Sequence, residues 1–511
     1  MPVRVATAAL LGIDALPVEL EVDLVRQGLP AFAMVGLAEG AVRESRERVL
    51  SALKNSGYKL PPARITVNLA PADMRKEGSA YDLPLAAALL AAAGVLPQNA
   101  ADGFFLAGEL SLSGEIKPVP GILPVAVTAR AAGARGLLVP RDNAREAAVV
   151  RDLPVYGLTS LAEAVDFLSG ETTLPPEPLP EPSANADPGD FGVDFSEVKG
   201  QQHAKRAVEI AAAGGHNLLF VGPPGSGKTM LAKRIPTVLP PLRFDEALEV
   251  TKIYSVAGQL PRQAALVETR PFRSPHHTIS DAGLIGGGSH PRPGEVSMAH
   301  KGVLFLDELP EFKKSVLEVL RQPLEDGKVT IARAAMSLTY PADFMLVAAL
   351  NPCPCGYLGD PRHECTCTEP QIQRYRSRLS GPLLDRIDLQ VEVPAVPYKE
   401  LRQEASPVDS AAMRDRVLAA RERQAARYAG TPMHVNAELS GIRLSTCCRL
   451  TDEEHRFLEG AVRRLGLSAR SHTRILRIAR TIADLDGDAG IRVEHLAEAV
   501  NLRGLDRQRE G

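Results

Sequence analysis

The feature that most constrains the fold is the octapeptide GPPGSGKT at residues 222–229, together with what stands on either side of it. The apolar run NLLFV ends at residue 221, and MLAKRI follows at residues 230–235 with the spacing of a helix. In a strand, glycine-rich loop and helix of this order, backbone N–H groups surround a phosphate at the N-terminus of the helix. The octapeptide therefore predicts an α/β domain that binds a nucleoside triphosphate.

The loop predicts roles for its own side chains and for an acidic pair further along the chain. The apolar run GVLFL ends at Asp307 and Glu308. Asp307 would hold Mg²⁺ together with Thr229, and Glu308 would activate the attacking water. Without the loop, such a pair would more often be a surface turn. The residues expected to bind ATP are Gly222, Pro223, Pro224, Gly225, Ser226, Gly227, Lys228 and Thr229, with Lys228 reaching the β- and γ-phosphates.

The chain has 511 residues, enough for two or three domains. Residues 171–191 are rich in proline and acidic side chains and hold no lysine or arginine, which predicts a solvated linker. Before it, residues 1–170 alternate short strand patterns with helical ones. After it, strands and helices alternate over residues 192–395, and residues 396–511 have an almost wholly helical pattern. The fold class is therefore α/β, with a helical C-terminal domain.

The composition argues against a membrane protein. The apolar run at residues 83–97 is too short to cross a bilayer, and the first twenty residues lack the uninterrupted apolar core of a secretory signal. We therefore expect a cytoplasmic protein with no membrane partner. The formal net charge of −3 leaves a nucleic-acid partner open, because such binding depends on a local basic surface.

Four of the six cysteines lie within residues 353–367, as two C-x-C pairs separated by nine residues. Clustered cysteines in a reducing compartment indicate a metal site, and glycines in this loop could turn the chain so that four thiolates meet around one Zn²⁺. His363 could replace one thiol. The alternative is a loop of four reduced thiols that packs on its neighbours. The candidate zinc ligands are Cys353, Cys355, Cys365 and Cys367.

The second half of the chain resembles the AAA+ ATPases, and specifically the magnesium-chelatase-like ComM (YifB) family. The strings that carry the resemblance are VKGQQHAKRA, GPPGSGKTMLAKR, FRSPHHTISDAGLIGGG, PRPGEVSMAHKGVLFLDELPEF, LLDRIDLQVEV and RILRIARTIADL. They imply an AAA+ P-loop core over residues 192–395, interrupted by the cysteine insertion, and a helical lid over residues 396–511.

The resemblance also implies roles for three further side chains. Asn351, after the apolar run FMLVAAL, matches the sensor that positions the attacking water. Arg386 matches the finger that enters a neighbouring subunit's ATP site, and Arg470 matches the sensor on the lid. A fixed guanidinium offsets charge that develops on the transferred phosphoryl group. The alternative for Arg386 is an ion pair with Asp385 or Asp388.

Two further segments match the family's pore elements. Residues 325–347 read as a hairpin around Ala334 and Ala335, with Arg333 near its tip. Residues 281–302 form a glycine-rich insert, and its candidate cations for phosphate contact are His290, Arg292 and Lys301. Each could instead be an exposed loop with solvated charges. Because the chain has no tryptophan and only 4% aromatic residues, DNA would be bound through its backbone, without sequence preference.

Residues 1–170 resemble the Lon-protease (S5-like) α/β fold through RKEGSAYDLPLAAALL and AGELSLSGEIKPVPG. A working Lon site needs a nucleophilic serine and a lysine that takes its proton. The nucleophile position falls on Ala80, with Ser79 one residue early, and the lysine position falls in the apolar run ILPVAV, after Lys117. We expect a catalytically inactive scaffold.

The resemblance implies a homo-oligomeric, six-membered ATPase ring that translocates on single-stranded, forked or branched DNA. Its task would be branch migration in homologous recombination and natural transformation, with ATP, Mg²⁺ and Zn²⁺ as cofactors. The alternative is a magnesium-chelatase-type ATPase that remodels a protein partner, and a third possibility is a degenerate ATP-dependent protease.

Overall fold

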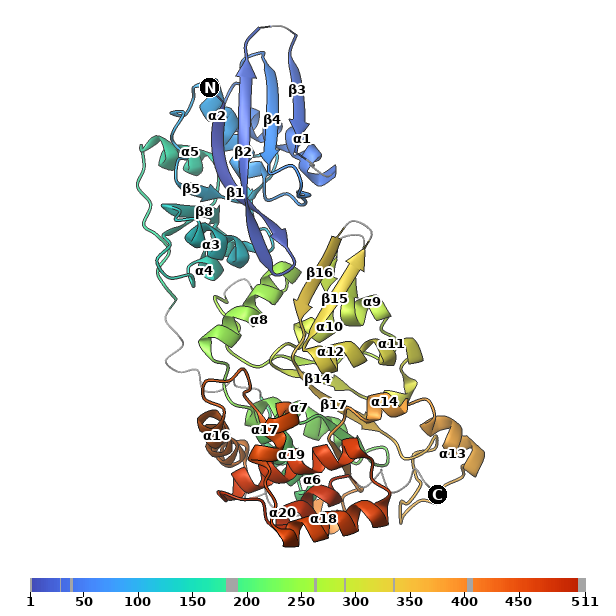
Figure 1. Cartoon of the computed structure of the whole chain (residues 1–511). Helices are drawn as coiled ribbons and strands as arrows, with labels where there is room; N and C mark the ends of the chain where they lie inside the picture. The colour runs from blue at the N-terminus through green and yellow to red at the C-terminus, as the bar shows by residue number, and fades with distance from the viewer. Residues whose placement is uncertain are drawn as a thin grey trace. The chain divides into compact units, whose positions relative to one another are not determined.

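The computed structural model packs as two compact units, whose elements are labelled in Figure 1. Unit 1 comprises Met1–Ala186 and Phe244–Val267, and unit 2 comprises Asp187–Arg243 and Glu268–Gly511. Residues 244–267, which the sequence pattern placed within a continuous domain over 192–395, thus pack with the N-terminal unit. The structure describes residues 2–27, 29–36, 40–180, 192–261, 264–288, 291–333, 336–401 and 408–503.

Unit 1 is built on a mixed sheet of seven strands in the order β3-β4-β2-β1-β5-β8-β9. Alternate side chains of β2 are buried, as a strand with one covered face requires, whereas the apolar helix α2 is buried almost throughout. The strands are β1 Val3–Leu11, β2 Asp14–Val25, β3 Ala31–Val35, β4 Arg64–Ala70, β5 Phe104–Leu106, β8 Gly136–Pro140 and β9 Val155–Leu158; a separate ribbon pairs β6 Glu109–Leu110 with β7 Ile116–Lys117.

Helices cover both faces of this sheet and give unit 1 two hydrophobic clusters. One cluster joins the sheet to α1, α2 and α5, and the other joins it to α3 and α4. The helices are α1 Gly40–Asn55, α2 Asp82–Ala93, α3 Ile122–Ala131, α4 Arg141–Ala147 and α5 Leu161–Ser169. Residues 171–180 contain no helix or strand, and residues 181–191 lie outside the described residues.

The helix α8, Phe244–Ala257, completes unit 1 although it follows the nucleotide loop in the chain. Leu248 packs against the cluster around α3 and α4. The Ser255 hydroxyl donates a 2.5 Å hydrogen bond to the buried carboxyl of Glu146, and Lys252 pairs with Asp14 at 2.9 Å. Apolar packing and specific polar contacts therefore hold α8 on this unit.

Unit 2 is built on a five-stranded sheet in the order β11-β14-β17-β10-β18, in which every neighbouring pair is parallel. Its strands are β10 Leu218–Val221, β11 Phe272–Arg273, β14 Val303–Leu306, β17 Met345–Leu350 and β18 Leu389–Glu392. Buried apolar side chains fill β10 and β14 along their whole length, as in a sheet covered on both faces. Because the strands are parallel, the loops after β10, β14 and β17 meet at one edge.

Helices pack around this sheet, and the C-terminal ones share a single hydrophobic cluster with it. The helices before and between the strands are α6 Gln202–Gly214, α7 Lys228–Val238, α9 Asp281–Ile285, α10 Glu295–Met298, α11 Lys314–Val319, α12 Arg321–Asp326, α13 Glu369–Arg376 and α14 Gly381–Leu384. The short helix α15, Tyr398–Leu401, follows the last strand. The C-terminal helices are α16 Ser410–Arg427, α17 Gly441–Cys447, α18 Asp452–Leu465, α19 Ala469–Asp486 and α20 Val493–Asn501, and single 3₁₀ turns occur at Phe195–Glu197, Leu309–Glu311 and Asn436–Glu438.

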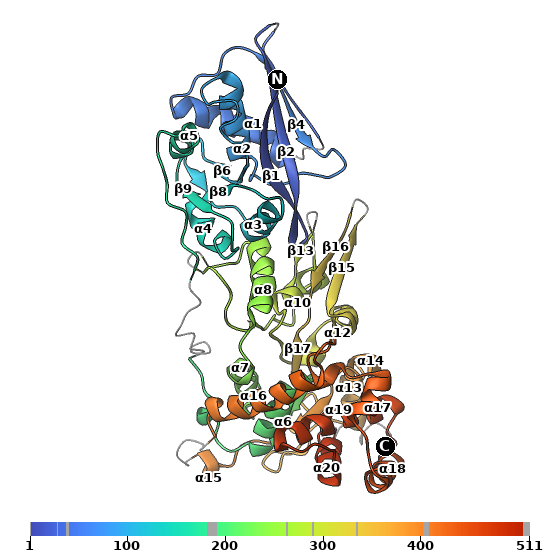
Figure 2. The same cartoon turned by 60° about the vertical axis from the view of Figure 1, so that its left-hand side comes forward.

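Two antiparallel ribbons of unit 2 lie close together, and Figure 2 labels β13 beside β15 and β16. One pairs β15, Lys328–Arg333, with β16, Met336–Pro341, and the other pairs β12, Gly286–Gly287, with β13, Arg292–Pro293. The Tyr340 hydroxyl on β16 donates a 2.7 Å hydrogen bond to the Pro291 carbonyl just before β13. The strands predicted around Ala334 and Ala335 are therefore present, although these two residues and His290 lie outside the described residues.

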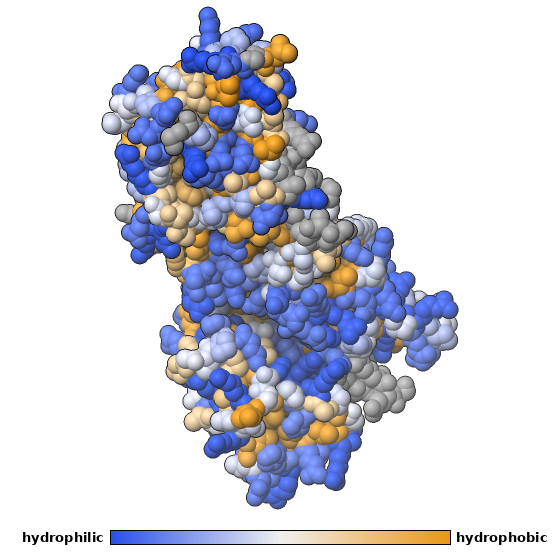
Figure 3. All heavy atoms as spheres, turned by 45° about the horizontal axis from the view of Figure 1, so that its top comes forward, coloured by the Kyte–Doolittle hydropathy of each residue, from blue (hydrophilic) through white to orange (hydrophobic). Residues whose placement is uncertain are grey.

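The surface is polar with interspersed apolar side chains on the face that Figure 3 presents. Single exposed apolar side chains are ordinary for folded proteins. In the described part of the chain, no helix combines the length and the apolar character needed to cross a membrane.

Candidate nucleotide site and cysteine cluster

The loop between β10 and α7 has the geometry of an anion cradle. Gly225 and Gly227 adopt φ of 74° and 93°, the left-handed region that glycine enters without steric cost. At Gly222 a Cβ would lie 2.1 Å from the Val393 carbonyl oxygen, so only glycine fits beside β18. The Ser226 hydroxyl is buried and makes no hydrogen bond to any described residue. These features fit the phosphates of a nucleotide at the N-terminus of α7.

Lys228 is the first residue of α7, and its ammonium group points back over the loop. Its Nζ donates to the carbonyls of Gly222 and Pro223 at 2.7 and 2.9 Å and to Asn351 Oδ1 at 3.2 Å. Burial lowers the pKa of this amine, whereas the nearby charges of Asp307 and Glu308 favour its protonated form. An ammonium group held among carbonyls in this way is well placed to bind phosphate oxygens.

The acidic pair after β14, Asp307 and Glu308, lies beside the phosphate loop. The Thr229 hydroxyl donates a 2.7 Å hydrogen bond to Asp307 Oδ2. A hydroxyl and a carboxylate beside phosphate oxygens are the donor set that Mg²⁺ takes in nucleotide sites. The strand order brings these groups together, because only β17 lies between β14 and β10.

Glu308 has a left-handed backbone, with φ of 51°, and its side chain is more than half exposed. Its Oε2 lies 3.6 Å from Nδ1 of His277, whose ring is tilted over that of His276. A carboxylate beside the metal-binding oxygens can accept a proton from water. The imidazole partner was not foreseen in the sequence, although the dipeptide His276–His277 within FRSPHHTIS was a visible signal for it.

Asn351 follows β17 and therefore lies between the loop and the acidic pair. Its side-chain oxygen accepts from Lys228, as described above. The structure thus gathers five predicted residues at one edge of the sheet, namely Lys228, Thr229, Asp307, Glu308 and Asn351.

Arg386 and Arg470 contact other groups in the single chain. Arg386 donates to the Pro382 carbonyl at 2.6 Å and forms an ion pair with Glu325, a carboxylate that the sequence reasoning did not consider as its partner. Asp385 instead pairs with Arg470 at 3.2 Å. Burial and the neighbouring charges of Arg321 and Arg470 lower the pKa of Arg386. Among the described residues, the contacts of these two arginines are with this cluster and not with the phosphate loop.

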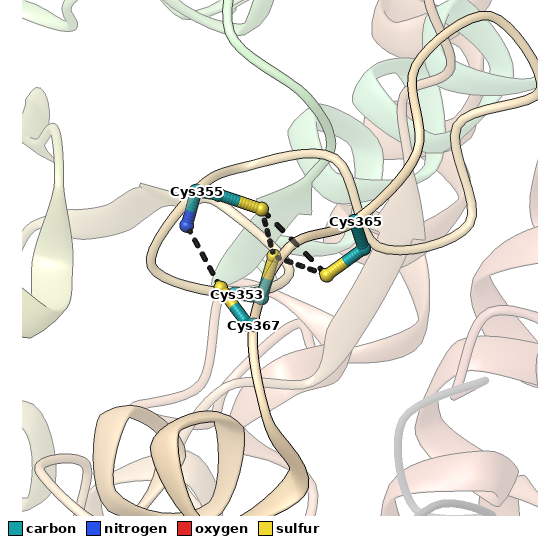
Figure 4. Close-up of side chains that lie close together, drawn as sticks. All are labelled: Cys353, Cys355, Cys365 and Cys367. Carbon is teal, nitrogen blue, oxygen red and sulfur yellow. Dashed lines mark hydrogen bonds between the residues drawn. The ribbon is translucent and has the colours of Figure 1, made fainter.

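Four cysteine sulfur atoms converge in the segment between β17 and α13, as Figure 4 shows. The Sγ atoms lie within 4.8 Å of one another, with Cys353 to Cys355 at 3.4 Å and both of these to Cys365 at 3.6 Å. A regular tetrahedron of thiolates around Zn²⁺ has S···S separations of about 3.8 Å. The donor set therefore fits zinc. His363 is not in this group, because its ring lies over Tyr357 and its Nδ1 is 3.5 Å from Asp360.

The residues predicted to contact DNA lie on the two ribbons. Arg292 begins β13 and is exposed, and Arg333 is the last residue of β15. Lys301 lies away from the ribbons and forms a 2.6 Å ion pair with Asp343. The structure thus brings Arg292 and the strand of Arg333 to neighbouring ribbons and assigns Lys301 a structural contact.

Three family models match successive parts of the chain. "Subunit ChlI of Mg-chelatase" matches residues 20–143, "Magnesium chelatase, subunit ChlI" matches residues 194–401, and the C-terminal model of the same subunit matches residues 407–503. These matches and the parallel sheet agree with the predicted α/β, magnesium-chelatase-like core.

Similar proteins cover almost the whole chain. Competence protein ComM of Haemophilus influenzae is 46% identical over 507 residues, which is 98% of this chain and 97% of that protein. The protein YifB of Escherichia coli K12 is 46% identical over 504 residues, again 98% and 97% of the two chains. The magnesium-chelatase 38 kDa subunit of Rhodobacter capsulatus is 24% identical over 335 residues, 60% of this chain and 85% of that protein. The chain therefore belongs to the ComM/YifB family of magnesium-chelatase-like AAA+ proteins.

Proposed function

We propose that this chain is an ATP-driven DNA motor that works as a hexameric ring and migrates DNA branches during homologous recombination and natural transformation. Family membership supports an AAA+ ATPase that uses ATP and Mg²⁺. The name of the Haemophilus relative, a competence protein at 46% identity, supports a role in DNA uptake and integration.

ATP hydrolysis would use the residues gathered at the edge of the parallel sheet. Lys228 binds the β- and γ-phosphates, and Thr229 and Asp307 hold Mg²⁺. Glu308 accepts a proton from the attacking water, which Asn351 helps to position. When bound, Mg²⁺ offsets the charge that develops on the phosphoryl group.

Arg386 and Arg470 would complete the site only in an assembled ring. In this proposal a neighbouring subunit supplies Arg386, and Arg470 on α19 reaches the nucleotide when the C-terminal helices close as a lid. The ion pair of Arg386 with Glu325 would have to open for this, because the same guanidinium cannot bind both groups.

The observation that most supports DNA as the substrate is how the two ribbons connect to the nucleotide site. From β13 the chain runs through α10 into β14, which Asp307 follows directly. From β16 it runs into β17, which Asn351 follows directly. A change at the γ-phosphate can therefore be transmitted to both ribbons through one strand each. Arg292 and Arg333 are two cations on these ribbons that suit the DNA backbone.

The alternative, a chelatase-type motor that remodels a protein partner, draws on the similarity to magnesium-chelatase subunits. The magnesium-chelatase 38 kDa subunit is 24% identical and leaves 40% of this chain uncovered, whereas the ComM and YifB relatives are 46% identical over almost the whole chain. The comparison therefore favours the DNA motor.

Unit 1 would serve this motor as an inactive Lon-like scaffold. The Ser79 hydroxyl donates to Glu109, and Lys117 pairs with Glu115 at 2.7 Å. In a catalytic serine–lysine pair the two side chains would contact each other. Here each of them contacts a glutamate instead. Active proteolysis is therefore not part of the proposal.

The test is ATP turnover by the full chain with forked DNA, a porphyrin or casein added. Forked DNA is expected to raise turnover, with an affinity that falls steeply as salt rises because bound counterions are released. Arg292→Ala and Arg333→Ala should lose this stimulation and strand displacement but still bind ATP. Arg463→Ala, at an exposed position on α18, serves as the control. Failure of the oligomer to bind or unwind branched DNA at low salt would reject the proposal in favour of the partner-remodelling motor.

A further inference from the structure

The cysteine insertion reaches the phosphate loop and helps to line cavities on both sides of it. One cavity of about 230 Å³ lies between Gly222–Pro223 of the loop and Leu358–Pro361 of the insertion. The other, of about 330 Å³, lies beside Gly225–Gly227 and is lined on one side by Arg362. The insertion is thus a wall of the nucleotide site.

The turn after Cys355 packs directly on the phosphate loop. Gly356 has φ of 88°, and a Cβ there would lie 2.6 Å from Cδ of Pro224 and 3.9 Å from Cγ of Asn351. Cys353, two residues after Asn351, is fully buried. This packing fixes where the insertion begins relative to the phosphate loop.

Asp360 fixes the direction of the chain at Arg362. Its carboxylate, which is almost fully buried, accepts a 2.7 Å hydrogen bond from the Arg362 backbone N–H and lies 3.7 Å from Nε of the same arginine. The Arg362 side chain is half exposed and lines the larger cavity. The cluster residue Cys365 follows three positions later, so the four thiols and Asp360 together hold the ends of this short segment.

The larger cavity has the chemistry of a nucleoside site. Its walls include the apolar side chains of Val198, Met230 and Leu231, and it adjoins the loop at the N-terminus of α7. Apolar side chains suit the faces of a purine, and a planar guanidinium stacks well on such a ring. Arg362 is the arginine among the residues that line this cavity.

We propose that Arg362 binds the nucleoside end of ATP, and that a zinc ion held by the four cysteines keeps it in place. Metal occupancy thereby sets the affinity of the nucleotide site. The inference rests on the proposed binding of ATP to the phosphate loop, but not on DNA as the substrate.

The first test compares nucleotide binding by full-length variants that all carry Glu308→Gln, so that ATP is not consumed. Arg362→Ala should weaken ATP and ADP binding by roughly tenfold, the loss expected for one charged contact. Binding of inorganic triphosphate, which has no nucleoside, should stay within about twofold of the parent on the same reasoning. Arg374→Ala, an exposed arginine on α13, is the matched control.

The second test removes the metal from the same proteins with a chelator, with zinc measured by elemental analysis before and after. Chelation should weaken ATP binding of the parent to the level of Arg362→Ala, and should weaken Arg362→Ala no further. Cys365→Ser combined with Cys367→Ser should reproduce the chelated parent. This non-additivity is expected only if the cluster acts through Arg362.

Each outcome has a definite meaning. Equal ATP binding by Arg362→Ala and its parent overturns the inference and leaves the ATPase proposal intact. A protein without zinc, or chelation that weakens inorganic triphosphate as much as ATP, overturns the metal-dependent part. A parent that does not bind ATP overturns both the inference and the proposed function.

Discussion

Two residues at the candidate nucleotide site, Glu308 and Lys228, have features that destabilise the folded chain. Glu308 has a left-handed backbone, which costs about 1–3 kcal/mol for a non-glycine residue. Lys228 is buried, and the burial opposes its charge. Both features place a charged group where a nucleotide would use it. Each is therefore a local cost to folding at a position that the proposed ATPase would use.

Two substitutions at this scale should separate binding from hydrolysis. Lys228→Ala is expected to abolish measurable ATP binding because the phosphates lose their cation. Glu308→Gln should bind ATP normally yet hydrolyse it roughly 10²- to 10⁴-fold more slowly, the usual contribution of a general base. Equilibrium dialysis and phosphate release measure the two effects. Equal ATP binding by wild type and Lys228→Ala would contradict the assignment of the lysine.

Among the secondary-structure elements, α8 has the least expected position, because it packs on unit 1. The contact centres on Glu146, whose carboxyl accepts from Ser255 of α8 and from Asn143. Burial raises the pKa of Glu146. The protonated carboxyl is therefore favoured in the folded state, and this contribution to stability is lost as pH rises through the raised pKa.

Glu146→Gln should remove this pH dependence, because the amide keeps the shape and hydrogen-bonding capacity without the charge. Relative to wild type, its melting temperature is expected to rise between pH 4.5 and 7, above the ordinary glutamate pKa of about 4.3. Thermal melting of the full chain across this range measures the difference. Glu47→Gln, at an exposed position on α1, is the control. A constant difference between wild type and Glu146→Gln at all pH values would refute the explanation.

For the whole molecule, the proposed ring predicts that neighbouring chains complete one another's nucleotide sites. Within one chain, Arg386 and Arg470 lie near each other, with Glu325 and Asp385 as their respective partners. A ring would place such a cluster against the nucleotide of the next subunit, because heterologous interfaces repeat around a closed rotation.

Mixing two inactive variants tests this arrangement. Arg386→Ala and Glu308→Gln subunits, mixed equally, should recover part of the ATPase activity, because about one interface in four then carries both intact groups. Lys228→Ala mixed with Glu308→Gln is the control, since both residues belong to the same subunit's site and no interface regains them together. Phosphate release by demonstrably mixed rings is the measurement. Absence of recovery would argue against a role for Arg386 across the interface.

The sequence by itself determined the features that depend on neighbours in the chain. The strand, loop and helix around residues 217–235 follow from local spacing, and the four cysteines lie close enough in sequence to meet in one loop. The resemblance to the ComM/YifB family, read from long specific strings, was confirmed by similarity over nearly the whole chain.

Only the tertiary structure decided which distant groups meet. Local periodicity predicts that residues 244–257 are helical, but the burial of Leu248 and Ser255 against α3 and α4 determines which unit the helix joins. The contact of His277 with Glu308, and the approach of Arg362 to the phosphate loop, likewise depend on strand order and loop packing. Such contacts join residues far apart in the chain. They form because separate segments bury their apolar surfaces against each other when the chain folds. The spacing of residues within one segment does not specify which other segment it will meet.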